Sequence, residues 1–154
     1  MAGRVIALVA LIAVSAVYGC GGKKSAGGTP AASEPDYVTV QHILIGFEGT
    51  LPDKNITRSK SEASALAREL YERAEAGEDF DTLVEEYTDD SVPGVYGIAN
   101  HDGQPDQARQ IYARSDMAQN FGDVSFSLEV GGIGLAEYHE KHCKYGWHVI
   151  VRIK

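Results

Sequence analysis

Patterning typical of a folded domain begins only at Tyr37 in this chain of 154 residues. Residues 5–17 form an unbroken run of apolar or small side chains, and residues 21–35 are rich in Gly, Ser, Ala and Pro with no apolar periodicity. Beyond them, β-branched runs and segments of helical spacing follow one another. The core must therefore come from residues 37–154, which is enough for one domain.

The patterned part predicts an α+β domain. Residues 38–45 are rich in β-branched side chains and stop at Gly46, as a strand does. Ser59 and Glu62 have capping-box spacing, so a helix is expected from there to Gly77, and a second helix opens at Asp79. The remaining expected elements are a short strand at 96–99, a short helix at 117–124, and strands at 132–138 and 147–153. Together they predict a small, mostly antiparallel four-stranded sheet covered by helices.

The N-terminal segment predicts export. Its apolar run has the length of a signal-peptide core and is shorter than the roughly 20 residues of a membrane span. Val17 and Gly19 precede Cys20 in a pattern that resembles the bacterial lipobox, whose cysteine is lipidated and becomes the first residue. We expect a signal peptide at 1–19 and a lipidated cysteine with a flexible linker at 20–36. The domain would then be anchored to a bacterial membrane on its extracytoplasmic side, in the cell envelope; a plain secretory signal is the alternative.

The net charge limits the expected binding partners, and the two cysteines limit the possible disulfides. The formal net charge is −8, so the chain has no field that would gather phosphate backbones, and nucleic acid is not an expected partner. If Cys20 carries a lipid, Cys143 is an unpaired thiol. A disulfide between these two cysteines is the alternative.

Four segments of the domain carry distinctive residues in a fixed order. They read VQHILI at 40–45, GEDFDTLV at 77–84 followed by YTDDS at 87–91, Met117 and Phe121 followed by FSLEVG at 126–131, and YGWHVI at 145–150. In this order they resemble the parvulin, or PpiC-like, peptidyl-prolyl cis/trans isomerases. The resemblance implies a rotamase that assists the folding of exported, proline-containing polypeptides. Rotation about a peptide bond breaks no covalent bond, so no cofactor is expected.

The resemblance also implies a catalytic group. His42 and His148 would lie on neighbouring strands and hydrogen-bond to each other, and Asp90 would stand beside the substrate carbonyl. Two core histidines that satisfy one another are the alternative for the pair. The adjacent Asp89 is interpreted as an exposed turn residue.

The proline pocket implied by the family rests on Met117 and Phe121, which are four residues apart and would share one face of a helix. An apolar pair at this spacing can also be plain core. Tyr96, Ile98 and Tyr145 are the expected rim of the pocket.

The chain departs from the family in three places. Residues 94–98 read GVYGI where parvulins usually have GGDLG, the connection 97–117 is longer, and the loop 137–144 is extended. These departures leave a second hypothesis open: a chaperone or peptide-binding module that keeps the fold with little or no turnover.

Two further groups of residues could suggest a binding site, but the surrounding sequence argues against both. Lys54, Arg58 and Lys60 are dispersed in an acidic domain, which argues against recognition of phosphorylated substrates. His139, His142 and Cys143 could ligate zinc or copper together with His101 or His148, but no second ligand pair has structural-zinc spacing. We therefore interpret this segment as a solvated loop and predict no metal.

Overall fold

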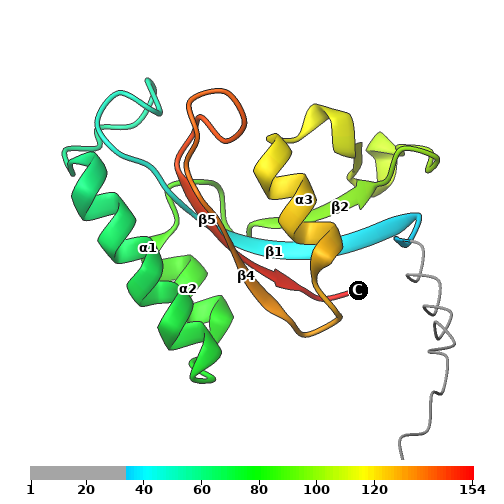
Figure 1. The fold of residues 1–154 in the computed structure, drawn as a ribbon, viewed down its shortest axis with the longest axis horizontal. Helices are drawn as coiled ribbons and strands as arrows, with labels where there is room; N and C mark the ends of the chain where they lie inside the picture. The colour runs from blue at the N-terminus through cyan, green and yellow to red at the C-terminus, as the bar shows by residue number, and fades with distance from the viewer. Residues whose placement is uncertain (1–33) are drawn as a thin grey trace, which may run out of the picture. The chain divides into compact units, whose positions relative to one another are not determined.

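The central strand of the fold is Tyr37–Ile45 (β1), which pairs on both sides within a five-stranded sheet of order β3-β2-β1-β5-β4. The computed structural model describes residues 34–154 (Figure 1). β1 is antiparallel to Val95–Ala99 (β2) and to Trp147–Arg152 (β5), and Ile133–Ala136 (β4) is antiparallel to β5. Ile111–Ala113 (β3) is parallel to β2.

The α+β class is confirmed, with one correction to the sheet. It has five strands rather than four; as predicted it is mostly antiparallel, and only the pairing of β3 with β2 is parallel. β3 spans only three residues inside the long connection 97–117. A strand of three residues is too short to show a pattern of alternating apolar and polar side chains. It forms through its pairing with β2, which is a tertiary contact that the local sequence does not reveal.

Side chains of β1 alternate between two cores. Ile43 and Ile45 face one side, while Val38 and Val40 face the other. Two helices, Lys60–Glu75 (α1) and Phe80–Tyr87 (α2), cover the first side, and Figure 1 shows them packed together to the left of the strands. Their buried residues are Ala63, Ala67, Leu70 and Ala74 of α1, with Leu83 and Val84 of α2.

Both helix starts are confirmed. The Ser59 hydroxyl accepts the backbone N–H of Glu62 and the Glu62 carboxylate accepts the N–H of Ser59, which completes the capping box. The Asp79 carboxylate accepts the N–H of Thr82 at the start of α2.

The other side of the sheet is covered by Gln119–Ser127 (α3), which packs Phe121 and Phe126 onto Ile98 and Ile150. This helix was predicted at 117–124, and it begins two residues later and continues to Ser127. Met117 therefore precedes the helix, with extended backbone dihedrals (φ −84°, ψ 159°). Two short 3-10 turns, Gln107–Arg109 (η1) and Arg114–Asp116 (η2), flank β3 in the connection.

The domain begins earlier than Tyr37. Arg114 pairs with the Glu34 carboxylate at 2.6 Å, and the N–H of Asn100 donates to the Asp36 carbonyl at 2.8 Å. Residues 34–36, which the sequence assigned to the linker, thus contact the folded part. The predicted signal peptide, Cys20 and the linker up to residue 33 lie outside the described residues. No helix within 34–154 is long and apolar enough to span a membrane.

Candidate active site

A small cavity of about 140 Å³ lies between β1, β2, β5 and the start of α3. It is far smaller than the roughly 300–1,000 Å³ of sites for drug-sized ligands, so it suits a single side chain. Its walls are His42, Asp90, Tyr96, Asp116, Met117, Ala118, Phe121, Tyr145 and His148. Every catalytic or proline-pocket residue predicted from the sequence lines this cavity except Ile98.

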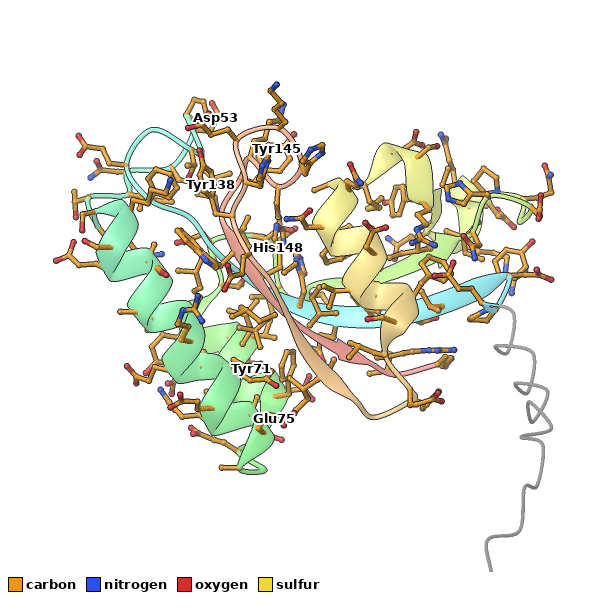
Figure 2. All side chains as sticks on the ribbon, in the orientation of Figure 1. Asp53, Tyr71, Glu75, Tyr138, Tyr145 and His148 are labelled. Atoms are coloured by element: carbon orange, nitrogen blue, oxygen red, sulfur yellow. The ribbon has the colours of Figure 1, made fainter. Side chains whose placement is uncertain are left out.

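Two strands position the histidines. In the antiparallel pairing of β1 and β5, His42 is opposite Ile150 and Leu44 is opposite His148, so the imidazoles stand diagonally on the same face. Their Nδ1 atoms are 2.9 Å apart, and the rings are stacked with centroids 5.1 Å apart. Figure 2 shows His148 near the centre of the molecule, below Tyr145 in the loop that leads into β5.

A chain of hydrogen bonds runs from Asp90 through both imidazoles. The His42 Nε2 atom is 3.0 Å from Asp90 Oδ2, and a carboxylate can only accept, so Nε2 donates. In the neutral pair the His42 Nδ1 then accepts from His148 Nδ1. The remaining nitrogen, His148 Nε2, is buried, carries a lone pair and bonds to no residue in the described part of the chain.

The surroundings hold these groups in defined charge states. Burial lowers the pKa of His148 to about 3, so its imidazole is neutral at physiological pH. The hydrogen bond from His42 holds the pKa of Asp90 well below its usual range, and the carboxylate is therefore ionised. Burial, together with a hydrogen bond donated to Asp90, raises the pKa of Tyr96 to about 12.

Aromatic rings enclose the histidines. The Phe121 ring lies 5.1 Å from both imidazole centroids, and the Tyr96 ring meets His42 edge-on at 5.2 Å. Phe121 is 3% exposed, so it is both a wall of the cavity and part of the core. Met117 reaches the cavity from the extended segment before α3, not from a helical face shared with Phe121.

The turn that carries Asp90 is held tightly against β1. The N–H of His42 donates to the Gly94 carbonyl at 3.0 Å. Gly94 has φ +67°, and a Cβ there would lie 2.6 Å from the His42 carbonyl oxygen. Only glycine permits this approach, which brings Asp90 and Tyr96 to the edge of the histidine pair.

Asp89 corrects a prediction. It is not an exposed turn residue: its side chain is 14% exposed, it forms an ion pair with Arg58, and it accepts the N–H of Gly46 at 2.8 Å. Asp89 thus fastens the turn to the end of β1. Arg58 is committed to this contact and Lys60 stacks on Tyr138, so these bases do not form a phosphate cluster. No local pattern signals the Asp89–Arg58 pair, since the two residues are far apart in sequence.

Two other predicted groups lie away from the cavity. Ile98 was expected at the rim but is fully buried. It shares a face of β2 with Tyr96 but is opposite Val38, where it packs in the core with Phe121 and Phe126. The buried Cys143 thiol donates to the Gly146 carbonyl, whereas His139 and His142 are exposed. Within residues 34–154 no three His, Cys, Asp or Glu side chains are grouped so that they could hold a metal ion.

A larger hollow lies elsewhere. An open groove of about 1030 Å³ runs along β1, β2 and the segment 104–111. No histidine lines this groove, and no buried phenylalanine comparable to Phe121 forms a wall of it. The small cavity is therefore the better candidate for a reaction site, because it combines an apolar wall with buried, perturbed titratable groups.

The mixed sheet, the paired histidines and the small cavity with its apolar wall together define a domain of the parvulin class. Residues 28–153 match the sequence profile of the PPIC-type PPIASE domain, and the chain belongs to that family.

Curated relatives include two proteins named Chaperone SurA. The one from Pseudomonas syringae pv. tomato is 30% identical over 124 residues, which cover 80% of this chain and 24% of the relative. The one from Chromohalobacter salexigens is 32% identical over 111 residues, covering 72% and 21%. The chain thus spans about a quarter of the length of these relatives.

Solved structures share the fold. The solution structure of TbPIN1 matches with a TM-score of 0.56 and 17% identity, covering 77% of this chain and 98% of that one. The peptidyl-prolyl isomerase ESS1 from Candida albicans matches with a TM-score of 0.55 and 21% identity, covering 77% and 63%. At these identities the likeness concerns the fold alone.

Proposed function

We propose that this chain is a peptidyl-prolyl cis/trans isomerase that assists the folding of exported polypeptides while anchored to a membrane through Cys20. The observation that carries the proposal is the cavity of about 140 Å³ in which an apolar wall, formed by Met117 and Phe121, faces an ionised carboxylate on a buried histidine pair. Export and anchoring rest on the apolar run at 5–17 and the lipobox-like residues before Cys20.

Cis/trans isomerisation breaks no covalent bond, so the protein does not need to form a covalent intermediate. Rotation about the X–Pro bond faces a barrier of about 20 kcal/mol, whereas cis and trans differ by only about 1 kcal/mol. A catalyst must bind the twisted amide more tightly than either planar form. The prolyl ring would sit against Phe121 and Met117, which hold it still while the preceding carbonyl turns.

Asp90 would contribute electrostatically. In a planar amide the nitrogen lone pair is delocalised and the oxygen carries negative charge; twisting returns the lone pair to nitrogen and reduces that charge. A fixed carboxylate near the carbonyl therefore disfavours the planar form more than the twisted one. His42 keeps Asp90 ionised, and the stacked His148 supports His42 from the neighbouring strand.

A second candidate function is a peptide-binding chaperone module without turnover. The observation that favours it is the similarity to two proteins named Chaperone SurA, of which this chain spans about a quarter. Such a module would use the same cavity to hold a proline without lowering the rotational barrier.

The experiment that separates the two measures refolding limited by proline isomerisation, and in parallel the binding of a proline-containing peptide. The wild-type chain is expected to do both, and Asp90→Ala to lose at least about tenfold in kcat/KM while still binding. Asp102→Ala, an exposed carboxylate away from the cavity, is the matched control and should behave as wild type. Binding without acceleration by the wild type would favour the chaperone module instead.

A further inference from the structure

The Tyr96 hydroxyl makes a contact that the pocket wall does not require. It donates to Asp90 Oδ2 at 2.9 Å, the same oxygen that accepts from His42 Nε2 at 3.0 Å. The other carboxylate oxygen is 3.4 Å from the Ser91 hydroxyl, a long contact. Donors from two strands, β1 and β2, therefore converge on one oxygen of a residue that itself belongs to a turn.

Strand pairing and ring packing fix the position of the Tyr96 side chain next to Asp90. It is opposite Val40 in the pairing of β1 and β2, and its half-buried ring packs edge-on against His42 and Phe121, at 5.2 and 6.4 Å between centroids. The hydroxyl is thus fixed by the sheet and by ring packing. Asp90 has a side chain that is 30% exposed, so a second donor from a neighbouring strand helps to orient its carboxylate.

We propose that Tyr96 is a positioning residue whose hydroxyl holds the Asp90 carboxylate against His42 and toward the cavity, so that the rate of isomerisation depends on this hydroxyl. The inference rests on the proposed isomerase function. It also gives a role to Tyr96 within the segment 94–98, where the chain departs from the usual parvulin sequence.

Charge supports the geometry. A hydrogen bond to an ionised acceptor is stronger than one between neutral groups. The Tyr96 hydroxyl contributes, after His42 and the backbone of Ser91, to the low pKa of Asp90.

The test begins with Tyr96→Phe, which removes the hydroxyl and keeps the ring as a wall. We expect kcat to fall about tenfold, the loss when one hydrogen bond to a charged group worth about 1.4 kcal/mol disappears, with KM for a proline peptide unchanged. The matched control is Tyr112→Phe: this ring packs on Tyr96 at 5.8 Å, and its hydroxyl bonds to no residue in 34–154. It should leave kcat unchanged.

A double-mutant cycle with Asp90→Ala decides whether Tyr96 acts through Asp90. If it does, Tyr96→Phe costs less than about twofold once the carboxylate is gone. An equal loss in both backgrounds, or no loss in the wild-type background, would overturn the proposal and leave Tyr96 as a wall only.

The same four proteins are unfolded in denaturant, which makes the outcome independent of activity. A coupling between Tyr96→Phe and Asp90→Ala in the free energy of unfolding supports the contact, and its absence overturns it. A wild-type chain that shows this coupling but no isomerase activity would overturn the proposed function while leaving the Tyr96–Asp90 contact in place.

Discussion

His148 is a buried titratable group of the site. The residue is 5% exposed, its Nδ1 bonds to His42, and its Nε2 bonds to no described residue. Burial of the imidazole disfavours its charged form, which couples the site to the stability of the fold. The burial of His148 and the aromatic ring of Phe121 each lead to a prediction.

The free energy of unfolding should depend on pH through His148. Its pKa is about 3 in the folded chain and near 6.5 when unfolded, so as the pH falls the unfolded chain takes up the proton first. The contribution of the neutral His148 to the free energy of unfolding is therefore fully present above about pH 6.5 and declines as the pH falls toward 3. Between pH 6.5 and 4, denaturant titrations should show this decline in the wild type and a flatter profile in His148→Gln. The exposed His101→Gln is the control, and should keep the wild-type slope.

Phe121→Leu should separate catalysis from packing. Phe121 and Phe126 are 3% and 4% exposed and lie in the same core, but only Phe121 lines the cavity. Each change to leucine should lower the unfolding free energy by about 1 to 2 kcal/mol. Only Phe121→Leu is expected to reduce kcat/KM, by about tenfold, because it removes the ring wall. Equal activity in the two variants would mean that the ring does not contact the proline.

At the scale of elements, the turn between α2 and β2 matters most. It carries Asp90, leads to Tyr96, and is fastened to β1 by the Asp89 carboxylate and by the close approach of Gly94. The site thus depends on how closely one turn lies against one strand.

Gly94→Ala tests this dependence. The new methyl group would lie 2.6 Å from the His42 carbonyl oxygen, so the turn must move away from β1. Gly49→Ala is the matched control: φ there is +85°, but nothing lies within 4 Å. The control should cost only the backbone term of about 1 to 2 kcal/mol, with activity kept. Gly94→Ala should cost more stability and also lower kcat/KM. Comparable stability and activity in the two variants would contradict the close-approach argument.

For the whole molecule, the proposed membrane anchor belongs to the segment before the domain. The domain from residue 34 onward is preceded by the apolar run and Cys20, and the formal net charge of −8 offers no attraction to an anionic membrane surface. A covalent lipid is therefore the proposed anchor.

Cys20→Ser should release the protein from the membrane fraction of a bacterial host that processes lipoproteins. A single thiol carries the proposed lipid, so the variant should also incorporate no labelled fatty acid. Cys143→Ser is the control for loss of a thiol: that residue is buried in the domain, and its replacement should leave membrane retention unchanged. Wild-type protein that incorporates no label would rule out the lipid anchor.

The elements that the sequence predicted well are those set by local interactions. β1, α1 and α2 follow from β-branched content, capping residues and helical spacing, which depend on neighbours a few positions away. The capping box at Ser59 could be located from four residues. The grouping of His42, Asp90, Met117, Phe121, Tyr145 and His148 required the family resemblance, since no local rule unites such distant segments.

Contacts between residues far apart in the chain could be found only in the tertiary structure. β3 forms because β2 is there to pair with it, Ile98 lies in the core because it packs with Phe121 and Phe126 of α3, and Met117 reaches the cavity without a helix. The Asp89–Arg58 pair and the Tyr96 hydroxyl on Asp90 likewise depend on where a turn meets a strand. Local propensity limits each segment to a few conformations, whereas the distances between side chains of different segments are set by packing the whole domain.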